Sequence, residues 1–323
     1  MNFLAPYASS IKSALRNLQL PDSPRTLYEP QKYILSNGGK RVRPILVLLS
    51  CGLCGRDMED ALPAALSVEL IHNFTLIHDD IMDQAKKRRG EATVHNKWDL
   101  STAILSGDSM FVQALLQLQK LPAEVDHKRI SGLLLEGVNQ VCEGQAMDME
   151  FESRNDVTSE EYLEMIGGKT AALISISMQM GGLVAGADAE KLDDLATIGT
   201  SLGVAFQIQD DWLDVVADPK KFGKKQGGDI SEGKKTFLML RTLEGCNSEE
   251  KEWLLNCLEN RPLDSKEIEN VIHLFKKYSV MDEAQKLISD YYRKAELAVQ
   301  KFGESNYKRD LQQLITYLQN RDH

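Results

Sequence analysis

Two long stretches of the chain are apolar on almost every side when they are drawn as helices. They are Leu62–Met82, "LPAALSVELIHNFTLIHDDIM", and residues 195–216. A helix that is apolar all round is normally buried inside a protein. Apolar residues recur at spacings of three and four nearly everywhere else, and strand-like alternation is scarce. We therefore expect an all-α fold, a single large helical bundle in which two central helices are wrapped by others.

Two later stretches, residues 282–302 and 307–319, have one apolar face and are rich in Lys, Glu and Gln, as outer helices usually are. The 323 residues can bury a large core, and no linker rich in Pro, Ser and Gly divides them. We therefore expect one domain over residues 1–323. The prolines should mark connections between helices, at Pro6, Pro21, Pro24, Pro30, Pro44, Pro122, Pro219 and Pro262.

The charge and the cysteines bear on partners and compartment. A net charge of -10 and a pI of about 5.2 disfavour nonspecific nucleic-acid binding, which needs many cations, so we expect no nucleic-acid partner. Five cysteines, an odd count, fit a reducing cytosol rather than a disulfide scaffold. Cys51 and Cys54 form a lone C-x-x-C inside "ILVLLSCGLCG", with no second pair, which favours core packing over a metal or redox site.

Two segments bear on export and on membranes. The N-terminus, "MNFLAPYASSIKSALRNLQLPDSP", has no cationic start followed by a long apolar stretch, so we expect no secretory signal and a cytoplasmic protein. The longest uncharged segment is residues 170–187, "TAALISISMQMGGLVAGA". Its serines, glutamine and glycines dilute its apolarity, so we expect a buried helix pair and no stable membrane insertion.

An acidic motif closes each of the two apolar stretches: "DDIMD" at Asp79–Asp83 and "DDWLD" at Asp210–Asp214. Carboxylates four residues apart share a helix face and repel each other, and acidic groups near a helix C-terminus oppose the macrodipole. One such motif would most simply be a solvated helix end, but two at corresponding ends favour a common ligand. Oxygen ligands alone select a hard cation, and Mg²⁺ is usually bound by one or two carboxylates together with substrate phosphates. The spacing does not match an EF-hand.

Several basic segments could bind those phosphates. "SNGGKRVRP" places Lys40, Arg41 and Arg43 after two glycines and before a helix that we expect Pro44 to open. Arg88 and Arg89 follow the first acidic motif. The segment "GGKT" is not a P-loop, but its lysine should open an apolar helix and face a cavity. "DPKKFGKKQGGDISEGKKT" has the composition of a closing lid. Together these features indicate a substrate with a diphosphate head and an apolar tail.

Five segments carry a resemblance to a known family: "GGKRVRP", "HNFTLIHDDIMDQAKKRRG" continuing to "TVH", "GGKTAAL", "FQIQDDWLD" and "GKKQGGDISEGKKT". In this order and approximate spacing the chain resembles the trans-prenyl diphosphate synthases, which elongate isoprenoid chains. The resemblance covers almost the whole length. It implies an all-helical homodimer with a deep central cavity in each subunit, and it implies magnesium, three ions per active site.

The resemblance also assigns roles to residues. Asp79, Asp83 and Asp210 match metal ligands that bind the allylic diphosphate, and Asp80, Asp211 and Asp214 would support them. The residues that match contacts to the same diphosphate are Arg88, Lys169, Lys224 and, in the lid, Lys234. The residues that match the isopentenyl diphosphate site are Lys40, Arg43, His72 and Arg89, although His72 could instead be a packed core histidine. Thr170 and Gln207 match positions whose polar atoms face the developing carbocation.

The mechanism implied by the resemblance needs no protein nucleophile, and no Ser/His/Asp or Cys/His arrangement is evident. Magnesium and the cations neutralise the leaving diphosphate, and the allylic C–O bond ionises. The double bond of isopentenyl diphosphate attacks the cation, and a proton is then lost to the departed diphosphate. On this interpretation Asp79 and Asp83 serve metal while Arg88 and Arg89 serve two different diphosphates. We therefore expect these aspartates and arginines not to be direct partners.

The length of the product depends, in this family, on the residues five and four positions before the first acidic motif, here Phe74 and Thr75. An aromatic residue only at the earlier position, without an insertion inside the motif, is most similar to short-chain geranylgeranyl synthases. We expect a C20 product, with C15 farnesyl diphosphate as the alternative. Projection on a helix places Phe74 about 140° from Asp79, so spacing alone does not show that it faces the tail.

Other classes of protein explain fewer of these residues. A terpene cyclase or a head-to-head condensing synthase would not need the isopentenyl set. A noncatalytic regulatory subunit commonly lacks one acidic motif, and both are intact here. A two-metal phosphohydrolase has little use for a long apolar cavity.

Overall fold

The computed structural model describes residues 2–216 and 227–321, and within them the chain is almost entirely helical. The only strands in these ranges are β1, Lys87–Arg88, and β2, Glu91–Ala92. They form an antiparallel hairpin in which Lys87 pairs with Ala92 and Arg88 with Glu91. The expected all-α fold is confirmed.

The chain divides into two compact units. The first unit comprises Met1–Val138, Ile176–Ala196 and Phe302–Asp310, and the second comprises Asn139–Ser175, Thr197–Lys301 and Leu311–His323. Each unit therefore draws on segments that are distant in the sequence. The first acidic motif belongs to the first unit, and the second acidic motif belongs to the second.

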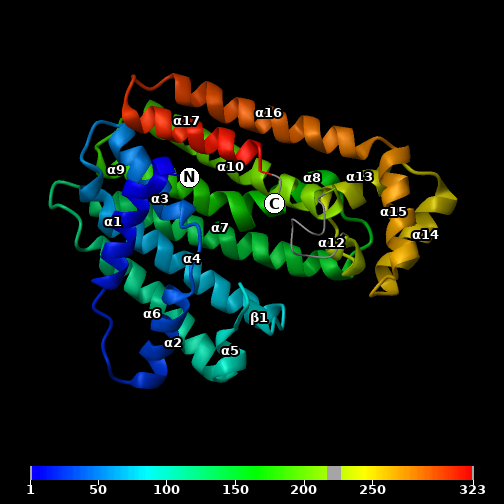
Figure 1. The fold of residues 1–323 in the computed structure, drawn as a ribbon, viewed down its shortest axis with the longest axis horizontal. Coiled ribbons are helices and arrows are strands. Elements are labelled where there is room, and N and C mark those ends of the chain that lie inside the picture. The colour runs from blue at the N-terminus through cyan, green and yellow to red at the C-terminus, as the bar shows by residue number, and fades with distance from the viewer. Residues whose placement is uncertain (1, 217–226, 322–323) are drawn as a thin grey trace. The chain divides into compact units, whose positions relative to one another are not determined.

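The first unit contains the helices of the N-terminal third. They are η1 (Asn2–Leu4), α1 (Ala5–Arg16), α2 (Arg25–Ser36), α3 (Val42–Leu53), η2 (Met58–Ala61), α4 (Leu62–Met82), α5 (Val94–Lys97) and α6 (Leu100–Leu118). Parts of α7 (His127–Ser153), α9 (Ala172–Val184), α10 (Ala189–Val216) and α17 (Asn306–Gln319) also belong to it. Helix α4 packs against α3 and α6, and α2 packs on α6 (Figure 1).

The core of the first unit lies around α3 and α4. Every residue from Pro44 to Leu53 is buried, and α4 buries side chains on all sides along most of its length, as its sequence predicts. Each buried Leu, Ile or Val contributes about 1.5–3 kcal/mol to folding relative to an exposed position. At Gly181 on α9 an added Cβ would lie 2.1 Å from the carbonyl oxygen of Val47 on α3, so only glycine permits this close approach.

The second unit contains the helices that follow α7. They are α8 (Ser159–Ile166), the π-helical turn η3 (Gly167–Ala171), most of α10, α12 (Gly228–Ser231), α13 (Phe237–Gly245), α14 (Ser248–Glu259), α15 (Ser265–Lys277) and α16 (Val280–Gln300). Helix α8 begins with a capping box between Thr158 and Glu161. Helix α13 packs against α8, α15 and α16 (Figure 1).

The outer helices form as their amphipathic sequences predict. Helix α16 spans Val280–Gln300, close to the expected residues 282–302, and α17 spans Asn306–Gln319. Along α16, Ala284, Ile288, Tyr292 and Ala295 are buried at spacings of three and four, while the rest of the helix is mostly exposed. Among the described residues, no helix combines the length and the apolarity that crossing a membrane requires.

Three expectations about helix boundaries were wrong. Residues 170–187 hold one continuous helical run, η3 and α9, followed by a turn, rather than a helix pair. Pro30 lies inside α2, where it cannot donate the expected backbone hydrogen bond. The helix continues through this position because Pro30, Gln31 and Ile34 are buried. Helix α3 begins at Val42, so Pro44 lies within its first turn.

Candidate active site

The first acidic motif lies at the C-terminal end of α4, where the β1–β2 hairpin returns a guanidinium to it. Arg88 donates from Nε to Oδ1 of Asp80 at 2.6 Å and from an Nη atom to Oδ2 of Asp79 at 2.9 Å. The expectation that these aspartates and Arg88 are not direct partners was therefore wrong. The chain reverses in the turn between α4 and β1, where Gln84 has a φ of 51°, so residues eight and nine positions apart meet.

The three aspartates of this motif differ in exposure. The side chain of Asp79 is 22% exposed and Asp83, the C-terminal cap of α4, is exposed, whereas Asp80 is buried. Burial raises the pKa of Asp80, and the charge of Arg88 acts in the opposite direction. Oδ2 of Asp80 is buried without a hydrogen bond to the described residues. Asp79 and Asp83 are thus the carboxylates of this motif that water or a metal can reach.

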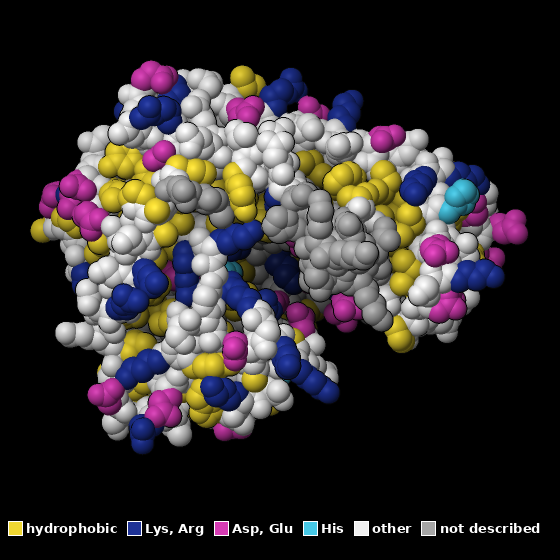
Figure 2. Space-filling view, viewed as in Figure 1, with side chains coloured by type: hydrophobic (Ala, Val, Ile, Leu, Met, Phe, Trp, Pro, Cys, Tyr) yellow, Lys and Arg dark blue, Asp and Glu magenta, His cyan; other side chains and the backbone are white. Residues whose placement is uncertain are grey.

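Arg41, Arg43 and Arg89 gather around His72 next to this motif in the first unit, and Lys40 directly precedes Arg41 in the chain. Arg43 approaches Nε2 of His72 at 3.4 Å, and Arg89 donates to the carbonyl oxygen of Gly38 at 2.5 Å. At Gly39 an added Cβ would lie 2.7 Å from Nη1 of Arg89, so glycine is required for this contact. Figure 2 shows dark-blue Lys and Arg side chains grouped over the region of α2, α4 and the hairpin. We call Lys40, Arg41, Arg43, His72 and Arg89 the cation cluster.

Burial and neighbouring charges change the pKa values of His72 and Arg43 in the cation cluster. Burial, followed by the charges of Arg43 and Arg89, lowers the pKa of His72 well below its usual value of 6.5, so the imidazole is neutral. Burial lowers the pKa of Arg43 to about 10, against the favourable charge of Glu69. Burial is the main cause of both shifts, and the guanidinium groups that act on His72 show that several positive charges lie close together, which suits a dianionic ligand.

The second acidic motif lies on α10 and is held differently. Asp211 is buried and accepts hydrogen bonds from the hydroxyl of Tyr162 and from Nε2 of Gln207, the latter at 3.2 Å. Burial raises the pKa of Asp211 to about 7. Asp214 accepts a hydrogen bond from the backbone N–H of Asp229 at 3.1 Å. The side-chain donors that hold the buried Asp211 are therefore neutral.

Asp210 is the exposed member of the second motif. Its side chain is 46% exposed and lies 3.4 Å from Nη1 of Arg321, near the C-terminus. Arg321 also donates to the carbonyl oxygen of Phe206 at 2.7 Å. Sequence reasoning missed Arg321 because nothing in its spacing relates it to α10.

The segment "GGKT" forms the π-helical turn η3. Nζ of Lys169 donates to Asp148 at 2.5 Å, and Oγ1 of Thr170 donates to Oε1 of Gln207 at 3.1 Å. At Gly203 on α10 an added Cβ would lie 2.4 Å from Cα of Ala171, so the two segments approach closely. Thr170, Gln207, Asp211 and Tyr162 thus form one hydrogen-bonded chain. Tyr162 was missed because it lies 49 residues from Asp211 in the sequence.

The lid segment is described only in part. Lys224, together with Lys220, Lys221 and Lys225, lies outside the described residues. Lys234 is described, and its Nζ lies 2.8 Å from Asp229 and 3.1 Å from Glu232.

The two residues expected to set product length lie on α4. The Phe74 ring packs edge-on against the ring of His78, with 4.8 Å between the ring centroids, and its centroid lies 5.8 Å from that of Phe111 on α6. An added Cβ at Gly107 on α6 would lie 2.4 Å from Nε2 of His78, so a glycine lets the helices approach there. The Thr75 hydroxyl donates to its own helix, at the carbonyl of His72. Phe111 is a neighbour that sequence reasoning missed.

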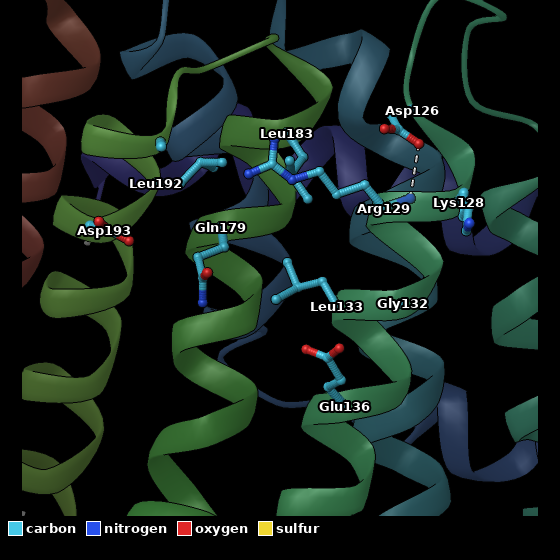
Figure 3. Close-up of a pocket in the computed structure, with 11 residues that line it drawn as sticks. Asp126, Lys128, Arg129, Gly132, Leu133, Glu136, Gln179, Leu183, Leu192 and Asp193 are labelled. Carbon is cyan, nitrogen blue, oxygen red and sulfur yellow. Dashed lines mark hydrogen bonds between the residues drawn. The ribbon is translucent and has the colours of Figure 1, made fainter.

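A separate pocket of about 510 Å³ lies in the first unit. It is formed by α7, α9 and α10, and the Arg129 side chain extends from α7 toward Leu183 (Figure 3). None of the sequence-predicted site residues lines it. Its charged groups are three carboxylates and two cations, which disfavours a diphosphate there: Asp126, Glu136, Asp193, Lys128 and Arg129.

The carboxylates suit a hard cation by their chemistry. No three His, Cys, Asp or Glu side chains come close enough to form a metal site by themselves anywhere in residues 2–216 or 227–321. Magnesium does not require such a cage, because one or two carboxylates and substrate phosphates usually bind it. Asp79 and Asp83 in the first unit, and Asp210 in the second, therefore each have the donor chemistry that such a cation requires.

Comparisons with known proteins show the family of the chain. The family model described as polyprenyl synthetase matches residues 24–275. A geranylgeranyl diphosphate synthase from Sulfolobus acidocaldarius is 41% identical over 298 residues, which cover 91% of this chain and 89% of that protein. A short chain isoprenyl diphosphate synthase from Methanothermobacter thermautotrophicus is 36% identical over 323 residues, which cover 100% of this chain and 99% of that protein.

A solved structure agrees as well. The crystal structure of a geranylgeranyl pyrophosphate synthetase from Pyrococcus horikoshii matches with a TM-score of 0.92 and 39% identity, covering 99% of this chain and 98% of that one. The resemblance found in the sequence motifs is thereby confirmed. The chain belongs to the polyprenyl synthetase family of trans-prenyl diphosphate synthases and is a chain-elongating prenyltransferase.

Proposed function

We propose that the chain condenses isopentenyl diphosphate with an allylic diphosphate and releases C20 geranylgeranyl diphosphate. The observation that carries this proposal is the cation cluster beside an acidic motif within one unit. A prenyltransferase that elongates chains must bind a second diphosphate that does not ionise, and a cluster of cations with a neutral histidine provides that site without metal. Lys40, Arg43, His72 and Arg89 bind this diphosphate.

The allylic diphosphate is bound by other residues. Asp79, Asp83 and Asp210 ligate magnesium, three ions in all, and Asp80, Asp211 and Asp214 support them. When bound, the magnesium supplies the positive charge that lets the allylic C–O bond ionise. The cations that bind the same diphosphate are Arg88, Lys169, Lys224 and Lys234. Arg88 then exchanges its bonds to Asp79 and Asp80 for bonds to the substrate, so that these carboxylates become available to magnesium.

The polar chain behind the second motif orients the groups that meet the carbocation. Oγ1 of Thr170 donates to Gln207, and Gln207 donates to Asp211, so both carbonyl and hydroxyl oxygens have defined directions. Such oxygens stabilise a developing positive charge without attacking it. The proton lost after condensation passes to the departed diphosphate, so no protein base is required.

The tail is limited by an aromatic wall. Phe74 packs on Phe111, and this pair closes the space beside α4 and α6 to a longer chain. Similarity to proteins named geranylgeranyl diphosphate synthase supports the C20 assignment. A C15 product is the alternative that the sequence leaves open.

The active form is a cytoplasmic homodimer, with residues 1–323 acting as one catalytic domain. The family model spans parts of both units, which supports a single catalytic domain. Five large apolar side chains are exposed on α6, and a second copy would cover them: Leu100, Ile104, Leu105, Val112 and Leu116. The odd number of cysteines favours a reducing compartment.

One experiment tests the reaction and the product together. The purified protein is incubated with magnesium, labelled isopentenyl diphosphate and dimethylallyl, geranyl or farnesyl diphosphate, and the products are sized. We expect C20 to dominate with each primer. Products of C15 or of more than C20 would correct the length. The absence of elongation with every primer would overturn the proposal and favour a noncatalytic subunit.

A further inference from the structure

A carboxylate is buried beneath the cation cluster. Glu69 on α4 has no exposed surface, and it is the one fully buried glutamate in the part of the chain that the structure describes. It lies three residues before His72 on the same helix. An ionised carboxylate in an apolar core is costly unless charged or polar partners compensate for its lost hydration. The partners of Glu69 therefore indicate what holds it there.

Glu69 is bound to Arg41. Its Oε1 accepts hydrogen bonds from Nη1 of Arg41 and from Nδ2 of Asn73, the latter at 2.6 Å. The other Nη atom of Arg41 donates to the carbonyl oxygen of Leu35 at 2.6 Å. The Arg41 guanidinium thus links the last turn of α2 to the middle of α4.

The backbone at Arg41 is in a conformation that needs such support. Its φ is 50°, in the left-handed region that residues other than glycine rarely adopt. Arg41 is also the N-terminal cap of α3, with Lys40 just before it and Arg43 in the first turn after it. A contact that holds Arg41 therefore sets the direction in which Lys40 and Arg43 leave the backbone.

Glu69 also compensates for charge. The guanidinium groups of Arg41, Arg43, Arg88 and Arg89 all act on His72, so they lie within one another's field. Glu69 acts favourably on both Arg43 and Arg89. Its second oxygen, Oε2, makes no hydrogen bond to the described residues, so its charge is shared mainly with the guanidinium groups.

We propose that Glu69 is a positioning residue for the homoallylic substrate. Through Arg41 it holds the junction between the loop that carries Lys40 and the first turn of α3, which carries Arg43. Its buried charge keeps the guanidinium groups close enough together to bind one diphosphate. The inference rests on the proposed isopentenyl diphosphate site and adds a residue that does not itself touch the substrate.

The test is the substitution Glu69→Gln, which keeps the shape of the side chain and removes its charge. We expect the KM for isopentenyl diphosphate to rise about 10- to 100-fold, as a small misplacement of binding groups can produce, while the KM for the allylic diphosphate stays within about twofold. Glu69→Asp, which keeps the charge on a shorter side chain, should give an intermediate KM. Ser67→Ala, a buried polar position on the same helix, is the control and should change neither KM.

Binding without turnover separates this inference from the proposed function. Isopentenyl diphosphate is not consumed without a primer, so its Kd is measured by calorimetry for the wild type and for Glu69→Gln. A wild type that binds it but elongates no primer would overturn the proposed function alone. Equal Kd and KM values in the two proteins would overturn the role of Glu69.

A purely structural role would look different. It would raise both KM values equally and lower the Tm, and that result would also overturn the inference. Should Glu69→Gln not fold, Arg41→Lys tests the same link from the other side, because a lysine has one nitrogen in place of the two Nη atoms that reach Glu69 and Leu35 separately. This variant should raise the KM for isopentenyl diphosphate selectively, and an unchanged KM would contradict the proposal.

Discussion

The two acidic motifs end similar apolar helices but hold their buried aspartates, Asp80 and Asp211, by different means. In the first unit one guanidinium, that of Arg88, donates to two aspartates at once. In the second unit Asp211 accepts hydrogen bonds from the neutral side chains of Tyr162 and Gln207. A charged partner balances the charge of the carboxylates, but an incoming anion can bind that partner in place of the carboxylates. Neutral partners orient a carboxylate and leave its charge unbalanced.

The difference indicates a division of roles. In the first motif, binding of a diphosphate to Arg88 would free Asp79 for metal at the same moment. In the second motif, the orientation of Asp211 should stay the same with or without substrate, because the Tyr162 hydroxyl that holds it is buried.

Removing an exposed aspartate from either motif should abolish most of the activity. Asp79→Ala and Asp210→Ala each remove a proposed metal ligand worth several kcal/mol in the transition state, so we expect turnover to fall by about three orders of magnitude. Circular dichroism should show an intact fold. Asp290→Ala, an exposed aspartate on α16, is the control. Turnover within tenfold of the wild type for either site variant would remove that motif from the metal site.

Removing the side chains that donate hydrogen bonds to the aspartates should distinguish the two motifs. Arg88→Gln loses charge-assisted bonds to substrate worth about 1.5–3 kcal/mol, so the KM for the allylic diphosphate should rise about 10- to 100-fold. Tyr162→Phe removes one neutral donor from Asp211, so turnover should fall about tenfold with little change in either KM. Steady-state kinetics with both substrates measures this. The same pattern in both variants would contradict the division of roles.

Only the helix of the first motif should control product length. Five residues before its motif it carries Phe74, whereas α10 carries the buried Ala205 at the corresponding place. Phe74→Ala and Phe111→Ala should each lengthen the main product by at least one C5 unit, because each opens the space between α4 and α6. Sizing of labelled products measures this, and Ala205→Gly serves as the control. An unchanged product in both aromatic variants would remove this pair from the wall of the tail pocket.

The two regions should respond to pH in opposite directions. His72 has a lowered pKa in the folded state, so its contribution to stability is present above about pH 6.5 and is lost as the pH falls below it. Asp211 has a raised pKa, so its contribution is present at low pH and is lost as the pH rises from about 4 toward 7.

Urea unfolding of the metal-free protein between pH 4 and pH 8 measures this difference. Relative to His72→Gln, the wild type should lose stability as the solution is made acidic. Relative to Asp211→Asn, it should lose stability as the pH rises toward 7. Parallel curves for either pair would show that the corresponding group keeps its usual pKa.

Helical periodicity predicted much of the fold because it depends on neighbours a few residues apart. The helix of the first motif spans Leu62–Met82, as its apolar sequence indicates, and the outer helices begin within about two residues of their expected positions. Pro30 shows where the method fails. Local propensity excludes proline from a helix interior, but burial of the same turn of α2 outweighs that preference.

The sequence by itself determined the helical class, the two acidic motifs, the basic segments and the family, because each of these depends on residue types and short spacings. Only the tertiary structure decided which groups meet. The bonds of Arg88 to Asp79, of Tyr162 to Asp211 and of Arg41 to Glu69 join residues 9, 49 and 28 positions apart. Helical spacing does not relate positions so distant, and the energy of a buried charge depends on the neighbours that the fold brings to it.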